Sequence, residues 1–309
     1  MLSNEKFTKA RHYIMTHARP LDRALFEFEF MDKSPRTVLD ILKTYQNEDG
    51  GFGQALEPDF RTKKSSVLAT TVAMQYVHEL KLSEPNEMIK QAILYLIREV
   101  QEFPKGSPLN YFWNLTPLES NHSLHAPWWS GKKLKTPRIE EWPNPSVEVI
   151  GYLLRYQQLI SQSLYDEIVR DLQKYLKLVP RLTEFIYYKF LCFKRLIPHV
   201  SQELSEDIMT MLDTTFENLE LLDEQKFEEI KIQRLITEKT SYLYQKHPKK
   251  MKQLIENEVK RLGDDGGSHP LWKWGEDEIW KQVEREWTGK CTYELLVTLK
   301  YCDLLHIGS

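Results

Sequence analysis

Cysteine is scarce in this sequence: the 309 residues include three, Cys192, Cys291 and Cys302. They are far apart and form no C-x-x-C pair, so we expect neither a disulfide framework nor a structural zinc site. Free thiols are typical of a reducing compartment. The first six residues also lack the apolar core of a signal peptide. These absences predict a cytoplasmic protein and give no reason to expect a metal or other cofactor.

Long apolar runs and a charge bias of one sign are also missing. No uninterrupted apolar stretch approaches the length of a membrane span. With 42 Lys and Arg against 45 Asp and Glu, the net charge is -3, and the basic stripe of a nucleic-acid-binding protein is absent. The hydrophobic fraction of 41% and charged fraction of 28% are typical of a soluble globular protein. We therefore expect no membrane span and no nucleic-acid partner, while the oligomeric state stays open.

Alternation of apolar and polar residues, the mark of strands, is nearly absent, and apolar residues recur instead at helical spacing. Helices are expected between residues 4 and 30, with Pro20 in the first turn of the second one, and then over 34–45, 69–80 and 89–100, where Ser83 or Asn86 can cap the last of these. More follow from about 146 to 262, including an inner, fully buried helix over 185–193. The chain is expected to end with two helices near 276–286 and 291–305. This pattern predicts an all-α protein.

Two glycine turns, over residues 45–53 and 263–268, resemble one another. Each follows an expected helix and contains Asp-Gly-Gly, at residues 49–51 and 265–267. Glycine permits positive φ, and an aspartate can hold a tight turn by accepting from nearby amides. No shift in composition marks a linker, and the second turn repeats the first. We therefore predict a single domain, residues 1–309, whose paired helices close as a ring.

Residues 103–146 differ from the rest of the chain, because no helical period survives there. Seven of the 15 prolines lie in this stretch, at positions 104, 108, 117, 127, 137, 143 and 145. A loop of about forty residues is much longer than an ordinary connection. Its many aromatic residues favour a packed loop over a disordered one. We expect it to cover one end of the barrel.

In the first turn, Gln46, Gly50 and Phe52 form a Q-x3-G-x-aromatic pattern, whereas around the second turn Leu262 and Ser268 stand at the glutamine and aromatic positions. The pattern of the first turn resembles the QW repeat of terpenoid cyclases and protein prenyltransferase β-subunits. The resemblance implies an α/α toroid, a closed barrel of inner and outer helices around a central cavity. It does not imply a reaction, because the D-x-D-D acid motif, the D-D-x-x-D magnesium motif and the prenyltransferase zinc ligands are missing.

All eight tryptophans lie in two stretches, at positions 113, 128, 129 and 142 and at 272, 274, 280 and 287. Such residues could line a pocket that stacks on sugar rings or holds an isoprenoid chain or a cation. Alternatively, they attach long loops to the rim of the barrel. On the first interpretation, the substrate-binding candidates are Trp113, Trp128, Trp129, Trp272, Trp274, His122 and His269.

Carboxylates and a histidine in the same stretches are candidates for catalysis: Glu57, Asp59, Asp264, Glu286 and His125. Two facing carboxylates can act as acid and base on a glycosidic bond, and a histidine beside a carboxylate can act as a general base. Glu57 or Asp59 would then face Asp264 or Glu286 across a wet cleft. The alternative is that these side chains are simply solvated.

Three functions remain open. An enzyme acting on a carbohydrate or similar ring is favoured by the tryptophans and carboxylates. A protein that binds or cyclises a prenyl or terpenoid chain is favoured by the QW-like turn. A non-catalytic binding or scaffold protein is equally compatible with the fold. In each case the implied partner is a small molecule in the central cavity.

Overall fold

The computed structural model of this chain describes residues 2–82, 85–130, 136–183, 186–219 and 231–305. It is mostly helical, with 63% helix and 4% strand, which confirms the prediction of an all-α protein. The named strands are short: β1 (Gln101–Glu102) pairs antiparallel with β2 (Tyr111–Phe112). Within the described ranges, no helix combines the length and the apolarity that crossing a membrane requires.

The chain divides into two compact units. Unit 1 contains Met1–Leu42 and Glu224–Ser309, and unit 2 contains Lys43–Asp223. Each is described by itself below. The single domain expected from the sequence stays a prediction.

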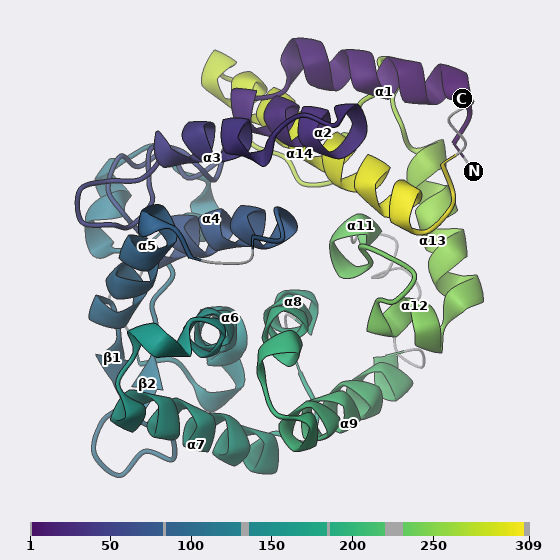
Figure 1. The fold of residues 1–309 in the computed structure, drawn as a ribbon. Helices are drawn as coiled ribbons and strands as arrows, with labels where there is room; N and C mark the ends of the chain where they lie inside the picture. Colours follow the sequence, from purple (N-terminus) through teal and green to yellow (C-terminus); the bar gives the residue numbers. More distant parts are fainter. Residues whose placement is uncertain (1, 83–84, 131–135, 184–185, 220–230, 306–309) are drawn as a thin grey trace. The chain divides into compact units, whose positions relative to one another are not determined.

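Unit 1 is built from both ends of the chain. Its helices are α1 (Asn4–His17), α2 (Pro20–Met31), α3 (Pro35–Lys43, whose last residue belongs to unit 2), α11 (Ile232–Leu235), α12 (Tyr242–Lys246), α13 (Pro248–Lys260) and α14 (Glu278–Tyr301). The long helix α14 packs against α1, α2 and α11 (Figure 1). The two ends of the chain meet where the Leu2 amide donates to the Leu304 carbonyl at 3.1 Å.

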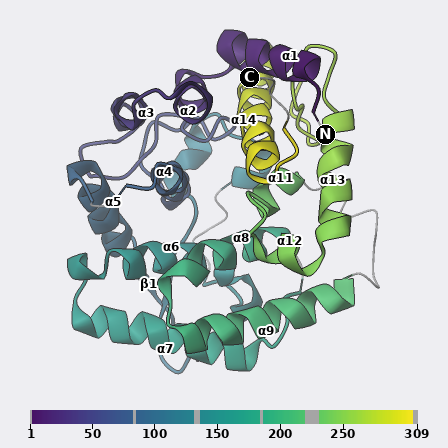
Figure 2. The same cartoon turned by 45° about the vertical axis from the view of Figure 1, so that its right-hand side comes forward.

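Unit 2 has two layers of helices (Figures 1 and 2). Its helices are α4 (Val67–Glu79), α5 (Glu87–Arg98), α6 (Pro143–Arg155), α7 (Gln162–Leu178), α8 (Ile186–Leu196) and α9 (Gln202–Leu219). In one layer, α6 lies between α4 and α8. In the other, α5 packs on α4 and α6, and α7 packs on α6 and α9.

Helix starts follow the local signals of the sequence. Pro20 occupies the first turn of α2, as predicted. The Ser66 hydroxyl accepts from the Ala69 amide at 3.0 Å and so caps α4, and Asn86 caps α5 by accepting from the Ile89 amide at 3.1 Å. Asn86 was one of the two caps expected for α5; the other, Ser83, lies outside the described residues.

Three expectations about helices were wrong. The final two helices are one, α14, which passes through Gly289; a Cβ there would lie 2.5 Å from the Ala18 Cβ, so the glycine serves packing and does not end the helix. Helix α8 is not buried on every side, because Tyr188 is 51% exposed. Helix α6 begins at Pro143, three residues before the expected end of the long loop.

The long loop is packed, as expected, in the part that the structure describes. It contains the 3-10 helices η1 (Leu118–His122), η2 (Pro127–Trp129) and η3 (Ile139–Glu141). Trp113 and Trp142 are buried, and their indole N–H groups donate to the carbonyls of Leu96 at 2.7 Å and Tyr111 at 2.8 Å. Trp113 thus attaches the loop to α5, and Trp142 joins two parts of the loop and packs on Tyr175 of α7, which fits the second interpretation of the aromatic residues.

Candidate functional site

The two glycine turns share one backbone geometry. Gly50 and Gly266 have φ of +85° and +87°. In the first turn the Asp49 Oδ1 accepts from the amide of the second glycine at 3.0 Å, and in the second turn the Asp265 Oδ1 does so at 2.9 Å. The resemblance seen in the sequence is therefore a resemblance in hydrogen bonding.

Each turn is also tied to the helix that follows it. The Phe52 amide donates to the Thr70 Oγ1 on α4 at 3.0 Å, and the Ser268 amide donates to the Thr292 Oγ1 on α14 at 2.8 Å. These bonds depend on the backbone of residues 52 and 268 and not on their side chains. The second turn thus keeps the geometry of the first although serine replaces the aromatic residue.

Each turn also lies against the backbone of a second helix, at a similar distance in the two cases. A Cβ at Gly50 would lie 2.5 Å from the Gln91 carbonyl oxygen on α5, and one at Gly266 would lie 2.4 Å from the Lys9 carbonyl carbon on α1. The residues four positions further along these helices are both tyrosines, Tyr95 and Tyr13. Both tyrosines face the second glycine of their turn.

A groove of about 880 Å³ lies beside the first turn in unit 2. Four segments line it: the turn itself, residues 63–67, the end of α5 with the residues after it, and the start of the long loop. Its side chains are mainly polar. They include Asn47, Glu48, Asp49, Lys63, Lys64, Ser65, Tyr95, Glu99, Gln101 and Asn114. Amides, hydroxyls, carboxylates and ammonium groups therefore face one space.

Hydrogen bonds fix the turn side of this groove. The Asn47 Nδ2 donates to the Lys63 carbonyl at 3.0 Å and to the Ser65 Oγ at 2.9 Å. The Ser65 hydroxyl in turn donates to the Asp49 Oδ1 at 2.7 Å. Burial, followed by the nearby Glu99 and Asp49 charges, raises the pKa of Tyr95, so this phenol stays protonated.

The candidate catalytic residues of unit 2 partly come together, but away from the residues that line the groove. Asp59 is buried, and its Oδ1 accepts from the Trp129 indole N–H at 2.9 Å. The His125 Nδ1 donates to the Ser123 carbonyl at 2.7 Å. Glu57, two residues before Asp59 in the sequence, is also buried. Asp59 and Trp129 hold the long loop against the segment after the first turn, and a catalytic role for these residues stays a prediction.

The other candidates in the long loop do not gather at one place. Trp113 is 2% exposed and is held by the bond to Leu96 described above. Trp128, by contrast, is 49% exposed, and His122 is exposed at the end of η1. None of the three lines the groove.

Tryptophans in unit 1 form a compact cluster. Trp272 and Trp274 pack, half-buried, against a core that contains Trp287 on α14. The ring centres of Trp272 and Trp287 are 5.2 Å apart. The Arg234 guanidinium carbon lies 4.7 Å from the Trp287 ring centre, while its Nε donates to Glu294 Oε2 at 3.0 Å.

The remaining candidates of unit 1 lie around the second turn and α14. The His269 Nε2 is 3.2 Å from both carboxylate oxygens of Asp265. Partial burial by itself would raise the pKa of Asp265, but hydrogen bonds from the Gly267 amide and His269 outweigh this effect and lower that pKa. Asp264 is exposed, and Glu286 accepts from the Gln282 side chain at 2.8 Å. Because Glu57 and Asp59 belong to unit 2, the expected facing of the two carboxylate pairs stays a prediction.

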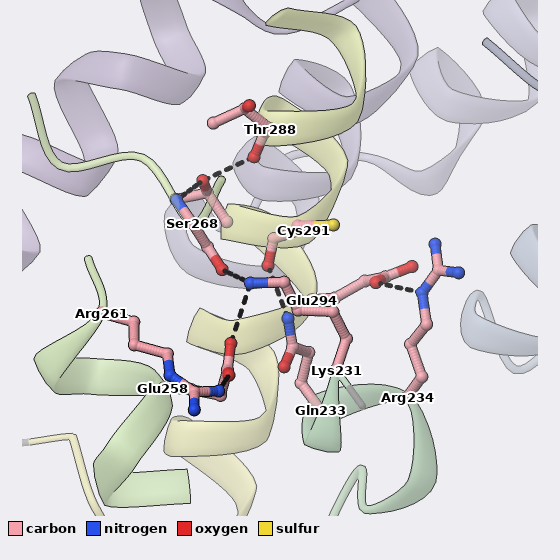
Figure 3. A network of polar contacts seen from close by, with 10 residues as sticks. Lys231, Gln233, Arg234, Glu258, Arg261, Ser268, Thr288, Cys291 and Glu294 are labelled. Atoms are coloured by element: carbon pink, nitrogen blue, oxygen red, sulfur yellow. Dashed lines mark hydrogen bonds and ion pairs between the residues drawn. The ribbon is translucent and has the colours of Figure 1, made fainter. Parts of the chain in front are cut away.

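A buried ion pair beside the second turn was not expected from the sequence (Figure 3). The Lys231 Nζ donates to Glu258 Oε2 at 2.9 Å and to Ser268 Oγ at 3.0 Å, and both charged side chains are 2% exposed. Arg261 donates to the other Glu258 oxygen at 3.0 Å. Ser268, the residue that departs from the QW-like pattern, is therefore a partner of a buried lysine. That departure was the one signal in the sequence for this network.

No three His, Cys, Asp or Glu side chains within the described ranges form a group that could hold a metal ion. Comparisons with protein-family models, curated proteins and solved structures found no match to this chain.

Proposed function

We propose that the groove of unit 2 binds a carbohydrate or a similar polar ring and that the chain is an enzyme acting on it. The supporting observation is the groove itself, whose volume of about 880 Å³ is within the range of small-molecule sites. Its amides, carboxylates and hydroxyls can exchange hydrogen bonds with sugar hydroxyls, and the Tyr95 ring offers an aromatic surface. A prenyl chain requires continuous apolar walls, and the polar side chains interspersed in this lining favour the sugar.

In this proposal, Glu48 and Glu99 supply the acid and the base. Both line the groove, and Glu99 is the less exposed of the two. The third carboxylate, Asp49, already accepts from the Gly51 amide and the Ser65 hydroxyl. The Asp49 Oδ1 accepts both of these hydrogen bonds and so holds the turn. Glycoside cleavage needs one carboxyl to protonate the leaving group and another to activate water or attack the ring.

A panel of neutral and acidic oligosaccharides tests the proposal, with binding followed by calorimetry and cleavage by release of reducing ends. Glu99→Gln should reduce the cleavage rate by about a hundredfold or more while binding persists. Glu102→Gln is the matched control, since Glu102 is exposed three residues away and does not line the groove. Binding without cleavage would favour the non-catalytic alternative. If no sugar binds, or if both variants behave like the native chain, the proposal is wrong.

We also propose that the helices close as the α/α toroid that the QW-like turn implies. The Gln46 side chain donates to the Gly50 carbonyl at 2.8 Å and to the Met88 carbonyl at 2.9 Å, which ties the turn to α5. Phe52, at the aromatic position, is buried. A crystal structure in which the two units do not complete a ring of helices would contradict this proposal. A cytoplasmic location, proposed from the free cysteines, is tested by cell fractionation.

A further inference from the structure

Six basic side chains gather where α4, α6 and α8 end in unit 2. They are His78 and Lys81 at α4, Arg155 at α6, Lys194 and Arg195 at α8, and His199 in the following 3-10 helix, η5 (Ile197–His199). Burial first, and then the charges of Arg155, Lys194, Arg195 and Lys81, lower the pKa of His78. All four cations thus lie close enough to act on one imidazole.

Arg155 is the centre of this basic cluster. Its Nη1 lies 2.7 Å from the His78 Nδ1. A guanidinium can only donate, so the His78 Nδ1 accepts and the neutral ring carries its proton on Nε2. The Arg155 guanidinium carbon also lies 5.3 Å from the centre of the Tyr156 ring. Among the residues that the structure describes, no carboxylate pairs with Arg155.

His199 adds a second imidazole to the cluster. Its ring centre is 6.1 Å from that of His78, with the rings edge to face. The buried Nε2 of His199 has no hydrogen-bond partner within the described ranges. Burial, with Arg155 and His78 contributing, lowers the pKa of His199 to about 4. Both imidazoles are therefore neutral near pH 7.

Glu148 is the carboxylate that pairs with Arg195 in this cluster. Glu148 accepts from the Arg195 Nη1 at 2.6 Å, and it also binds Gln75 at 2.9 Å and the Tyr152 hydroxyl at 2.7 Å. With the Cys192 thiol, which donates to Glu148 Oε2 at 3.9 Å, this carboxylate is shared with three further donors. Cations near helix C-termini are favoured by the helix dipole, but that effect does not require a guanidinium to donate to a neutral histidine instead of a carboxylate.

We propose that this basic cluster binds a small-molecule oxyanion of the phosphate type, with Arg155 as its main ligand. A guanidinium recognises phosphate oxygens with two parallel hydrogen bonds. His78 offers its Nε2 proton as a further donor, and Lys81, Lys194 and Arg195 supply charge. No member of the cluster lines the groove of the proposed function, so the two sites are independent.

Inorganic phosphate is the probe, with sodium chloride at equal ionic strength as its reference. The C–H signals of labelled histidines report the pKa of each imidazole by NMR. Phosphate should raise the pKa of both His78 and His199, because a bound anion stabilises their charged forms. Equal shifts with phosphate and with chloride would show screening alone and overturn the proposal.

Variants then test the role of Arg155. Arg155→Gln should weaken phosphate binding by about tenfold or more, because it removes a charge-assisted pair of hydrogen bonds. Arg155→Lys keeps the charge but cannot make the two parallel hydrogen bonds, so its phosphate affinity should lie between those of the native chain and the Arg155→Gln variant. Arg36→Gln is the control, since its side chain is 87% exposed on α3. Circular dichroism establishes that each variant is folded. Unchanged binding in a folded Arg155→Gln variant contradicts the assignment.

Discussion

Ser268 departs from the QW-like pattern in its side chain, but its backbone keeps the hydrogen bond that the pattern makes in the first turn. Its amide makes the bond to Thr292 that Phe52 makes to Thr70 in the first turn. The serine hydroxyl accepts from Lys231, whose charge is otherwise balanced by Glu258. A large aromatic side chain at position 268 would take the place of this acceptor. The buried lysine and the serine therefore depend on each other.

The buried pair predicts an order of stability among variants. Glu258→Gln should lower the free energy of unfolding by about 3–5 kcal/mol, because Lys231 is then buried without a carboxylate. Lys231→Met should cost less, about 1–3 kcal/mol, because Arg261 still pairs with Glu258. Urea denaturation followed by circular dichroism measures both.

Glu278→Gln is the control for these variants. Glu278 pairs with Lys281 at 2.7 Å on the surface, with its side chain 83% exposed, so its loss should leave the denaturation midpoint unchanged. A Lys231→Met variant less stable than Glu258→Gln would contradict the ordering.

At the scale of elements, the two glycine turns show why these positions exclude other residues. Gly50 and Gly266 combine positive φ with close approach to the backbone of a neighbouring helix, α5 or α1. The approach involves carbonyl groups of a helix, which cannot move aside as a flexible side chain would. Each turn thereby fixes the distance between the helix that follows it and a helix beside it.

Gly50→Ala and Gly266→Ala should each lower the free energy of unfolding by about 3 kcal/mol or more, because backbone strain and steric overlap add. Gly106→Ala measures the cost of the positive φ without steric overlap, because Gly106 has φ of +92° and an added Cβ meets no atom within 4 Å. It should cost only about 1 kcal/mol. Chemical denaturation compares the three, and equal losses at all three positions would show that the close approach is unimportant.

At the scale of the whole molecule, unit 1 needs both ends of the chain. Helix α14 packs against α1 and α2, and Gly266 lies against Lys9. Unit 2 is continuous in sequence and contains its own two layers of helices. Helix α14 therefore lacks its packing against α1 and α2 until the N-terminal helices are present, while it keeps its contacts with α11 and the tryptophans of the C-terminal part.

Removal of residues 1–42 should consequently unfold residues 231–305 while residues 43–219 stay protected from hydrogen exchange. The physical reason is that most helical stability comes from the packing of an apolar face, and α14 would lose its contacts with both α1 and α2. Mass spectrometry of peptic fragments after exchange measures each region separately, with the full chain as reference. Retained protection across 278–301 would show that α14 packs without the N-terminal helices.

The features read correctly from the sequence are those that depend on neighbours along the chain. Apolar residues at helical spacing placed α1, α4, α5 and α7, and capping residues such as Asn86 placed helix starts. The Asp-Gly-Gly turns were recognised because their geometry is set within five residues. The division of the last segment into two helices was wrong: α14 is continuous and passes through Gly289, which contacts Ala18.

The sequence by itself thus determined the helical class, the two turns and the packed long loop. Only the tertiary structure decided which side chains meet. The groove combines residues 47–49, 63–67, 95–101 and 114–118, and the basic cluster combines the ends of three helices. Lys231 meets Glu258 and Ser268 across 27 and 37 positions of sequence. Such sites depend on how helices pack, and the periodicity of a single helix carries no information about its partners.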